Sequence, residues 1–228
     1  MTRLAVSIFV RHIEAALADT ARAAEFGADL VEFRLDAFAG DTADLPGLVE
    51  RSPLPCIATC RPAWEGGLSE QDDAGWLAVL KAACSGPRKP AYLDAELAAY
   101  EADRTFRNGV RLLVGEVGTG LILSSHDFTT RPATLYRSLE AMIADPFCRV
   151  AKLAWYARSL RDNLEAFEIL RQGYKPTIAL CMGEFGLASR VLAKKFGALL
   201  TFASLDDHGR TAPGQPTLAE LKNLYRWD

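Results

Sequence analysis

The sequence has no long apolar run and no excess of charge of one sign. Its 228 residues include 26 Lys and Arg against 29 Asp and Glu, a formal net charge of −3. No run approaches the ~20 apolar residues that cross a bilayer, and the apolar stretch in residues 1–10 is too short for a signal peptide. The charge balance provides no basic surface for nucleic acid or an anionic membrane. We therefore expect a cytoplasmic protein with neither nucleic-acid nor membrane partners.

Cysteine and histidine are also scarce. The five cysteines, at positions 56, 60, 84, 148 and 181, are odd in number and spread over a long chain, which argues against a disulfide framework. Cys56 and Cys60 have no further Cys or His nearby to complete a zinc site. We expect the cysteines to be small core residues. The histidines are His12, His126 and His208, which are the candidate proton carriers.

Short apolar runs alternate with longer amphipathic ones along the whole chain. With 50% hydrophobic residues the chain can bury a sizeable core, and we expect one domain over residues 1–228. The apolar runs predict eight strands, at 4–9, 29–35, 55–60, 90–97, 120–125, 148–154, 176–182 and 198–203. The amphipathic runs predict helices at 13–26, 43–51, 71–84, 98–107, 133–143, 160–172, 187–196 and 217–225. Gly27, Gly173 and Gly197 follow three of these helices, where a left-handed C-terminal cap is expected.

Eight repeats of strand and helix predict a single (β/α)8 barrel, which would be a small one with short loops. The alternative is an open doubly wound sheet, which usually has fewer strands and often a glycine-rich loop after the first. Here the first strand runs into Phe-Val-Arg-His (9–12), which has no glycine. Residues 107–119 fit the pattern least well, and Gly-Glu-Val-Gly-Thr-Gly (115–120) is predicted as turns. This run precedes a strand and does not open a helix, so it is not a phosphate loop.

Lys152 is the most informative residue. It lies in Cys-Arg-Val-Ala-Lys-Leu-Ala (148–154), a mostly apolar run that predicts a buried parallel strand. Burying a lysine is costly because desolvation disfavours its ammonium form. A lysine shifted toward the free amine is a nucleophile for carbonyl groups. The sequence therefore predicts that Lys152 serves a chemical purpose.

Charged side chains gather where the other predicted strands end, which is the catalytic edge of a barrel. A period of two places Glu32, Arg34 and Asp36 on one face of their strand, toward the barrel mouth, and the apolar residues 31, 33 and 35 toward the helices. The next strands end in further charged groups: Arg61, Glu65 in a loop with two glycines, Asp94 and Glu96.

His126 ends the strand that precedes the lysine strand, where it could move protons near neutral pH. The neighbouring Asp127 is expected to cap the following turn. Arg190 follows a turn in which Gly183 and Gly186 would let the backbone approach a ligand closely. Arg190 could bind a carboxylate with two parallel hydrogen bonds.

Together these groups predict a cation-rich pocket in which Arg34, Arg61 and Arg190 surround Lys152. Burial and nearby cations both favour the free amine. This suggests that the lysine forms an imine with a ketone and that a proton is then removed beside the imine. The substrate should be small, hydroxylated and anionic. No metal is required, because the iminium accepts the electron pair.

In order and spacing these residues resemble the type I 3-dehydroquinate dehydratases, the Schiff-base lyases of the shikimate pathway. The resemblance extends from Ser7 to Gln215, nearly the whole chain. It is carried by Glu-Phe-Arg-Leu-Asp (32–36), Thr-Cys-Arg (59–61) with Glu-Gly-Gly (65–67), Asp-Ala-Glu (94–96), Ser-Ser-His-Asp-Phe (124–128), Ala-Lys-Leu-Ala (151–154), Met-Gly-Glu-Phe-Gly-Leu-Ala-Ser-Arg (182–190) and Ala-Pro-Gly-Gln (212–215).

The resemblance implies a homodimeric (β/α)8 barrel that dehydrates 3-dehydroquinate to 3-dehydroshikimate without a cofactor, in the biosynthesis of aromatic amino acids. It implies that Lys152 forms the imine with the C3 ketone, that His126 removes the C2 proton and helps protonate the departing C1 hydroxyl, and that Glu65 closes over the substrate. It also implies seven substrate-binding residues: Ser7, Glu32, Arg34, Arg61, Arg190, Thr211 and Gln215.

Two alternatives remain open. An aldolase-type barrel would share Lys152 but would favour a phosphate site after strands seven and eight, where Arg190 and Gln215 are better matched to a carboxylate. A barrel without activity, used as a binding or regulatory module, is the second. The Lys, His and Glu at three separate strand or loop positions argue against it.

Overall fold

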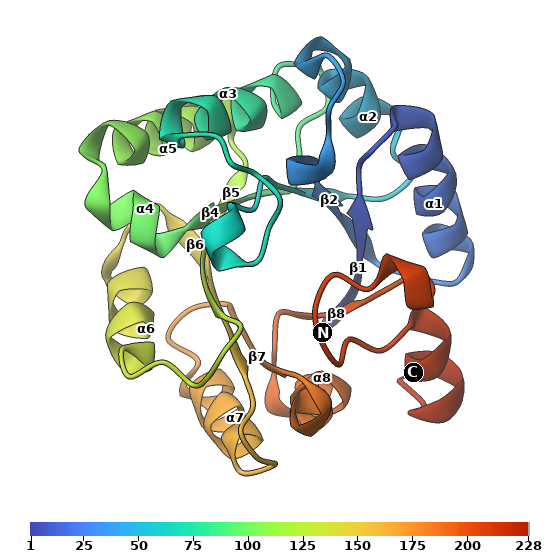
Figure 1. The fold of residues 1–228 in the computed structure, drawn as a ribbon, viewed down its shortest axis with the longest axis vertical. Helices are drawn as coiled ribbons and strands as arrows, with labels where there is room; N and C mark the ends of the chain where they lie inside the picture. Colours follow the sequence, from blue (N-terminus) through green and yellow to red (C-terminus); the bar gives the residue numbers. More distant parts are fainter. Residues whose placement is uncertain (228) are drawn as a thin grey trace.

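The computed structural model describes residues 1–227, which form eight parallel strands arranged as a barrel (Figure 1). Neighbouring strands pair in the order β7-β6-β5-β4-β3-β2-β1-β8, and a 2.9 Å hydrogen bond from the Leu199 N–H to the Thr177 carbonyl links the two ends of this sheet. The strands are β1 Arg3–Phe9, β2 Leu30–Arg34, β3 Cys56–Thr59, β4 Tyr92–Glu96, β5 Gly120–Asp127, β6 Cys148–Tyr156, β7 Thr177–Met182 and β8 Leu200–Ala203. Each predicted strand is present, and the predicted (β/α)8 barrel is confirmed.

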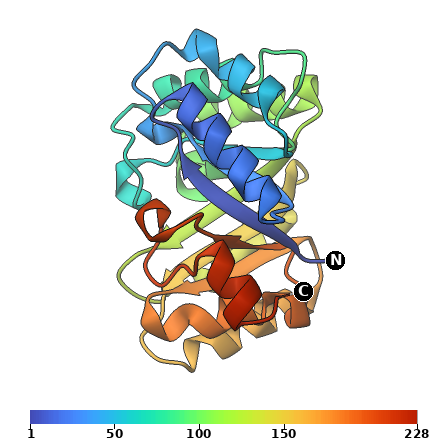
Figure 2. The same cartoon turned by 90° about the vertical axis from the view of Figure 1, so that its right-hand side faces the viewer.

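Helices surround the strands, and Figure 2 shows them on both sides of the sheet that crosses the middle of the molecule. They are α1 Ile13–Glu25, α2 Leu45–Arg51, α3 Asp73–Ala83, α4 Leu97–Ala102, α5 Arg104–Val117, α6 Leu135–Ala144, α7 Asp162–Gln172 and α8 Leu187–Val191. A last helical segment contains the π-helix Glu220–Leu224. Gly27, Gly173 and Gly197 have φ of 76°, 66° and 79°, which confirms the predicted left-handed caps.

The alternation of side chains along each strand creates two apolar cores. Outward-facing residues such as Val31 and Phe33 pack with the helices in the larger core. Inward-facing residues such as Leu30, Ile57 and Ile178 fill the barrel interior in the smaller one. This interior core supports the polar residues that follow it toward the carboxyl ends of the strands.

The prediction of turns at residues 115–120 is wrong for residues 115–117, because α5 extends through residues 107–114, which fitted the pattern least well, to Val117. The Asp103 carboxylate accepts hydrogen bonds from the N–H groups of the first turn and begins this helix. Phe106, Val110 and Val114 then recur at helical spacing and are buried. Gly118, with φ of 75°, ends the helix. The glycines within the helix hid this pattern in the sequence.

The predicted helix at 187–196 is interrupted at Leu192, after which Ala193–Phe196 forms a 3₁₀ turn. All five cysteines are buried and free, as predicted. Among residues 1–227, no helix combines the length and the apolar character needed to cross a membrane.

Candidate active site

Every predicted site residue lies in one pocket at the carboxyl ends of the strands. The pocket holds about 440 Å³, its open mouth included, and apolar side chains such as Phe128, Leu180 and Phe202 complete its wall. The predicted residues that line it are Ser7, Glu32, Arg34, Arg61, Glu65, His126, Lys152, Arg190, Thr211 and Gln215. The fold therefore brings together residues that are up to 208 positions apart, from 7 to 215.

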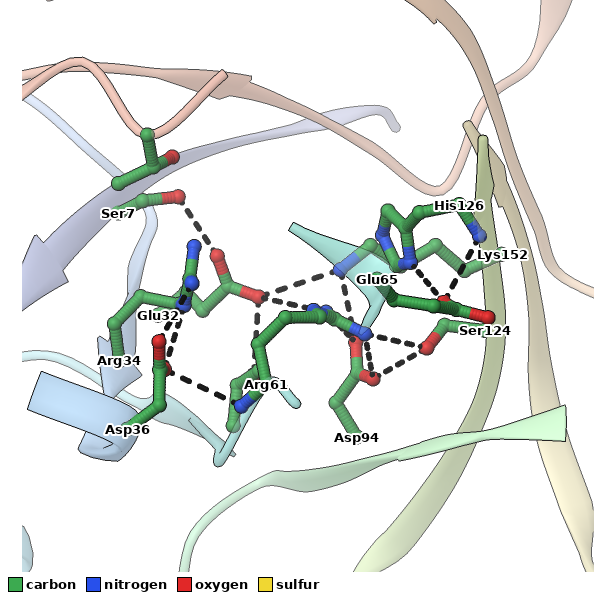
Figure 3. A network of polar contacts seen from close by, with 12 residues as sticks. Ser7, Glu32, Arg34, Asp36, Arg61, Glu65, Asp94, Ser124, His126 and Lys152 are labelled. Carbon is green, nitrogen blue, oxygen red and sulfur yellow. Dashed lines mark hydrogen bonds and ion pairs between the residues drawn. The ribbon is translucent and has the colours of Figure 1, made fainter. Parts of the chain in front are cut away.

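Lys152 projects into the barrel from the middle of β6. Val150 and Ala154 face inward with it and belong to the interior core, so the period of two places the lysine on the same side. Its side chain is 5% exposed. Lys152 Nζ lies 2.8 Å from Asp94 Oδ2 and 3.3 Å from Glu32 Oε1 (Figure 3). The ammonium is thus desolvated by the protein and held by two carboxylates.

Arg61 connects these carboxylates to two further polar side chains, Ser124 and Glu96 (Figure 3). Its guanidinium lies 3.1 Å from both Asp94 oxygens, donates to Ser124 Oγ at 2.8 Å and pairs with Glu96. Ser124 Oγ in turn donates to Asp94 Oδ1 at 2.6 Å. Asp94 and Glu96 were predicted to lie at the catalytic edge but were assigned no role in the site, and neither was Ser124. The signal for the two carboxylates was present, because they have the same period-two spacing at a strand end as Glu32 and Arg34.

The predicted excess of positive charge around Lys152 is wrong. Asp36 binds Arg34 through two hydrogen bonds of 2.8 and 2.7 Å, and Arg61 is balanced by the carboxylates of β4. Burial favours a neutral carboxyl, but Arg61 and Lys152 together lower the pKa of Asp94 to about 2. Lys152 and Arg61 likewise outweigh burial and lower the pKa of Glu32. The inward-facing carboxylates of β2 and β4 therefore neutralise most of the cations.

His126 and Glu65 form a second pair beside this network, with Glu96 Oε2 3.5 Å from His126 Nδ1. His126 Nδ1 lies 2.9 Å from Glu65 Oε2, which also accepts the His126 backbone N–H at 3.0 Å. Burial raises the pKa of Glu65 to about 8, although Arg61 opposes this. Burial, together with Arg61 and Lys152, lowers the pKa of His126 well below its usual value. At neutral pH the pair is a protonated carboxyl beside a neutral imidazole, an acid and a base in contact.

The loop that carries Glu65 is fixed by hydrogen bonds and close packing. The Asp36 carboxylate accepts the backbone N–H groups of Arg61 at 3.3 Å and of Leu68 at 3.0 Å, at the two ends of the loop. A Cβ on Gly67 would collide with the Arg61 carbonyl, so the close return of the loop requires glycine. Asp36 therefore holds both Arg34 and the loop that aims Glu65 at His126.

Arg190 is the cation of the pocket that the protein does not balance. The residue is 1% exposed, and its Nε has no hydrogen-bond partner among residues 1–227. Burial lowers its pKa to about 10, and no carboxylate contributes an opposing effect. A buried cation without a partner is unfavourable, and an anionic ligand would supply the missing partner.

The glycines before Arg190 have a different role from the one predicted. Neither lines the pocket; instead they allow chain segments to pack closely. Gly183, with φ of 80°, donates its N–H to the Pro213 carbonyl at 2.9 Å, and a Cβ on Gly186 would collide with the Cys181 backbone. Gly183 therefore joins the loop before Arg190 to the loop of residues 211–215, and Gly186 lets this loop pack against the end of β7.

The last predicted contacts come from this loop and from β1. Gln215 Oε1 accepts the Thr211 N–H at 2.8 Å and its hydroxyl at 3.1 Å. Gln215 lines the pocket, and its amide nitrogen makes no hydrogen bond within residues 1–227. Ser7 Oγ donates to Glu32 Oε2 at 2.8 Å. Asp127, which was predicted to be a cap, accepts the Thr129 N–H at 2.9 Å.

Among residues 1–227, one group of side chains has the composition of a metal site. Ligand atoms of Glu65, Glu96 and His126 lie within 4.8 Å of one another. Glu96 is already paired with Arg61, and the positive charges of Arg61 and Lys152 act on the same imidazole. This electrostatic environment disfavours a divalent cation.

The fold and the site define a class of protein. A buried lysine, a neutral histidine and a carboxylic acid meet at the carboxyl ends of a (β/α)8 barrel, the position where such barrels carry their catalytic groups. A lysine amine with an acid–base pair beside it is the equipment for imine chemistry. The chain is therefore a barrel enzyme of the Schiff-base-forming kind.

Comparisons with known proteins identify the family. The model of the type I 3-dehydroquinases matches residues 4–228. The chain is 36% identical over 205 residues to the 3-dehydroquinate dehydratase of Desulfotalea psychrophila, covering 88% of this chain and 87% of that protein. It is 37% identical over 218 residues to the chloroplastic bifunctional 3-dehydroquinate dehydratase/shikimate dehydrogenase of Arabidopsis thaliana, covering 94% of this chain but 35% of that longer protein.

The fold agrees with this result. The crystal structure of 3-dehydroquinate dehydratase from Geobacillus kaustophilus superposes with a TM-score of 0.83 at 23% identity, over 99% of this chain and 90% of that one. The chain belongs to the type I 3-dehydroquinase family.

Proposed function

We propose that this enzyme dehydrates 3-dehydroquinate to 3-dehydroshikimate and water through an imine on Lys152, as a step of the shikimate pathway. One observation carries the proposal: the same pocket contains a buried lysine, a neutral imidazole and an arginine whose charge no carboxylate neutralises. The lysine and the imidazole supply the chemistry for a ketone. The buried arginine favours a substrate that carries a negative charge. The family model and the relatives named 3-dehydroquinate dehydratase support the same substrate.

The substrate is held at two ends. Arg190 binds the carboxylate, because that anion supplies the partner that its buried guanidinium lacks. Thr211 and Gln215 hold the C1 hydroxyl beside the carboxylate. At the other end Glu32, Arg34 and Arg61, with Ser7 in a minor role, contact the ring hydroxyls. These roles are the ones that the family resemblance implies, and the fact that all of these side chains line one pocket supports them.

Imine formation begins when His126 accepts a proton from Lys152, and the free amine nitrogen attacks the C3 carbonyl carbon, whose oxygen takes up a proton. The carbinolamine that forms then loses its oxygen as water, leaving a C=N bond to the lysine nitrogen. His126 is neutral at physiological pH, so it can accept and return the protons of these steps. The iminium draws electrons from C2, which makes the C2 proton acidic.

Elimination follows at C2 and C1. His126 removes the C2 proton, and the electron pair passes into the iminium to give an enamine. The electrons then return from the nitrogen, form the C1–C2 double bond and expel the C1 hydroxyl. His126 returns its proton to this hydroxyl, which leaves as water, and Glu65, which is protonated below about pH 8 and lies 2.9 Å from His126 Nδ1, assists this transfer. Hydrolysis of the new iminium releases the product and regenerates Lys152.

We further propose that the chain acts as one barrel domain, forms a homodimer and works in the cytoplasm, as the family resemblance implies. Leu160 before α7, Leu164 in the first turn of α7 and Phe185 before α8 are exposed apolar side chains that an interface could cover. Light scattering of the purified protein tests the dimer. A monomer mass at micromolar concentration would refute it.

The absorbance of the conjugated enone product tests the reaction itself. We expect turnover in the parent and none in Lys152→Ala, because no other amine lines the pocket among residues 1–227. We expect His126→Ala to form the imine but to accumulate it, because C2 loses its base. If His126→Ala produces the enone at the parent rate, the role assigned to His126 is wrong.

A further inference from the structure

Phe202 lies directly against the nucleophile and has no part in the mechanism described so far. The Lys152 Nζ is positioned over the face of the Phe202 ring, 4.7 Å from its centroid. Phe202 projects from β8 into the barrel interior and lines the pocket. Both residues are at most 5% exposed, so water does not screen the contact. A cation over an aromatic face at this distance is attracted by the quadrupole of the ring.

The change of Lys152 during catalysis alters which of its neighbours can still stabilise it. As an ammonium, the lysine has three N–H groups and can donate to both Asp94 and Glu32. As an iminium, the nitrogen is still positively charged but keeps one N–H, so it can donate to one carboxylate. The aromatic face requires no N–H, because it attracts the charge itself.

We propose that Phe202 is a catalytic residue that stabilises the Lys152 iminium through a cation–π interaction. The inference rests on the imine mechanism proposed above and adds a residue to it. The ring partly replaces the hydrogen bond that the nitrogen loses on becoming an iminium. It thereby shifts the equilibrium between free ketone and imine toward the imine.

Fluorination of the ring tests this role without changing its place in the core. Phe202 is replaced through an expanded genetic code by its 4-fluoro, 3,5-difluoro and pentafluoro analogues, which withdraw electron density from the face in increasing order. Each protein is mixed with 3-dehydroquinate over a range of concentrations, reduced with borohydride and analysed by mass for the fraction of Lys152 that is alkylated. This gives an apparent dissociation constant of the imine for each ring.

We expect this constant to rise with each added fluorine, to about tenfold for the pentafluoro ring. Phe202→Leu, which keeps an apolar side chain but has no aromatic face, should show a rise of about the same size. The pentafluoro analogue at Phe33 is the matched control. Phe33 is fully buried in the outer core, away from the pocket, so its fluorination should leave the constant unchanged.

An imine dissociation constant that is the same for all four rings, in proteins with the parent unfolding midpoint, would overturn the role of Phe202. A rise of the imine dissociation constant in Phe202→Leu without any trend along the fluorinated series would overturn it too, because the loss of packing alone explains that result. Failure of the proposed mechanism looks different: the unsubstituted protein would then give no adduct on Lys152 at any concentration.

Discussion

Lys152 and Arg190 both present a positive charge to the pocket, but the protein compensates them differently. Lys152 is paired with Asp94 and Glu32 at 2.8 and 3.3 Å, whereas the Arg190 guanidinium has an unsatisfied Nε among residues 1–227. The lysine pairing keeps the nucleophile in one place until the ketone arrives. The Arg190 guanidinium keeps donors that only a bound substrate would satisfy. Because a buried cation without a partner is unfavourable, this lowers the stability of the ligand-free protein.

Arg190→Met should therefore stabilise the ligand-free protein and weaken its binding of substrate. Burial lowers the pKa of Arg190 to about 10, so at neutral pH the folded state is penalised for holding the charged form. We expect the free energy of unfolding to rise by about 1–3 kcal/mol and the KM to rise by about a hundredfold or more. Urea unfolding and steady-state kinetics measure the two effects.

Arg149→Met is the control for this prediction. Arg149 is exposed on β6, outside the pocket, and its replacement should change neither quantity. A variant at Arg190 that is less stable than the parent and keeps the parent KM would contradict the assignment of Arg190 as the carboxylate site.

Glu65→Gln should change the pH dependence of both stability and activity. The pKa of Glu65 is about 8 in the folded protein against a model value of 4.5, so the folded state binds more protons between these values. Stability is therefore lost as pH rises through this window, up to the folded pKa. We expect Glu65→Gln to raise the free energy of unfolding at pH 9 by about 2–4 kcal/mol and to have little effect at pH 4.

The same substitution should remove the fall in kcat of the parent as pH rises through about 8, and leave a lower activity that does not vary there. Unfolding curves at both pH values and a kcat profile check these expectations. Glu70→Gln, in the same region of the chain but exposed, is the control. An alkaline fall in kcat that persists in Glu65→Gln would show that another group controls it.

Among the helices, α5 has one glycine in its interior and another at its C-terminal end, and the two have different structural roles. Gly115 lies within α5 and a Cβ there meets no atom within 4 Å, whereas Gly118 ends the helix with φ of 75°. We expect Gly115→Ala to stabilise the protein by about 0.5–1 kcal/mol and Gly118→Ala to destabilise it by about 1 kcal/mol. Thermal unfolding of the two variants checks this. Equal effects of the same sign would contradict the boundary of α5 at Val117.

Regular elements were predictable where the apolar period was unbroken. In β2, Glu32 and Arg34 point into the barrel and Phe33 points outward. This alternation fixes which face of a buried parallel strand meets the helices. The pattern in α5 is interrupted by Gly109 and Gly115, so its continuation through residue 117 depends on packing that the sequence does not display. Tertiary contacts, not local preference, decide such segments.

At the scale of the whole molecule, the barrel explains why the members of the site were predictable but their charge balance was not. Strand ends that are far apart in sequence meet at one rim, so a list of the polar residues there is already a list of candidates. The sequence does not show which inward side chains reach one another inside the barrel. Asp94 on β4 contacts Arg61, which follows the adjacent β3, and Lys152 on β6, from which β4 is separated by β5.

The most direct measurement is reduction of the mixture of protein and 3-dehydroquinate with borohydride, followed by peptide mass analysis. We expect one adduct, located on Lys152, and the same adduct in the control Lys194→Arg, because Lys194 lies outside the pocket. Absence of any adduct, or an adduct on Lys194 or Lys195 with Lys152 unmodified, would contradict this expectation.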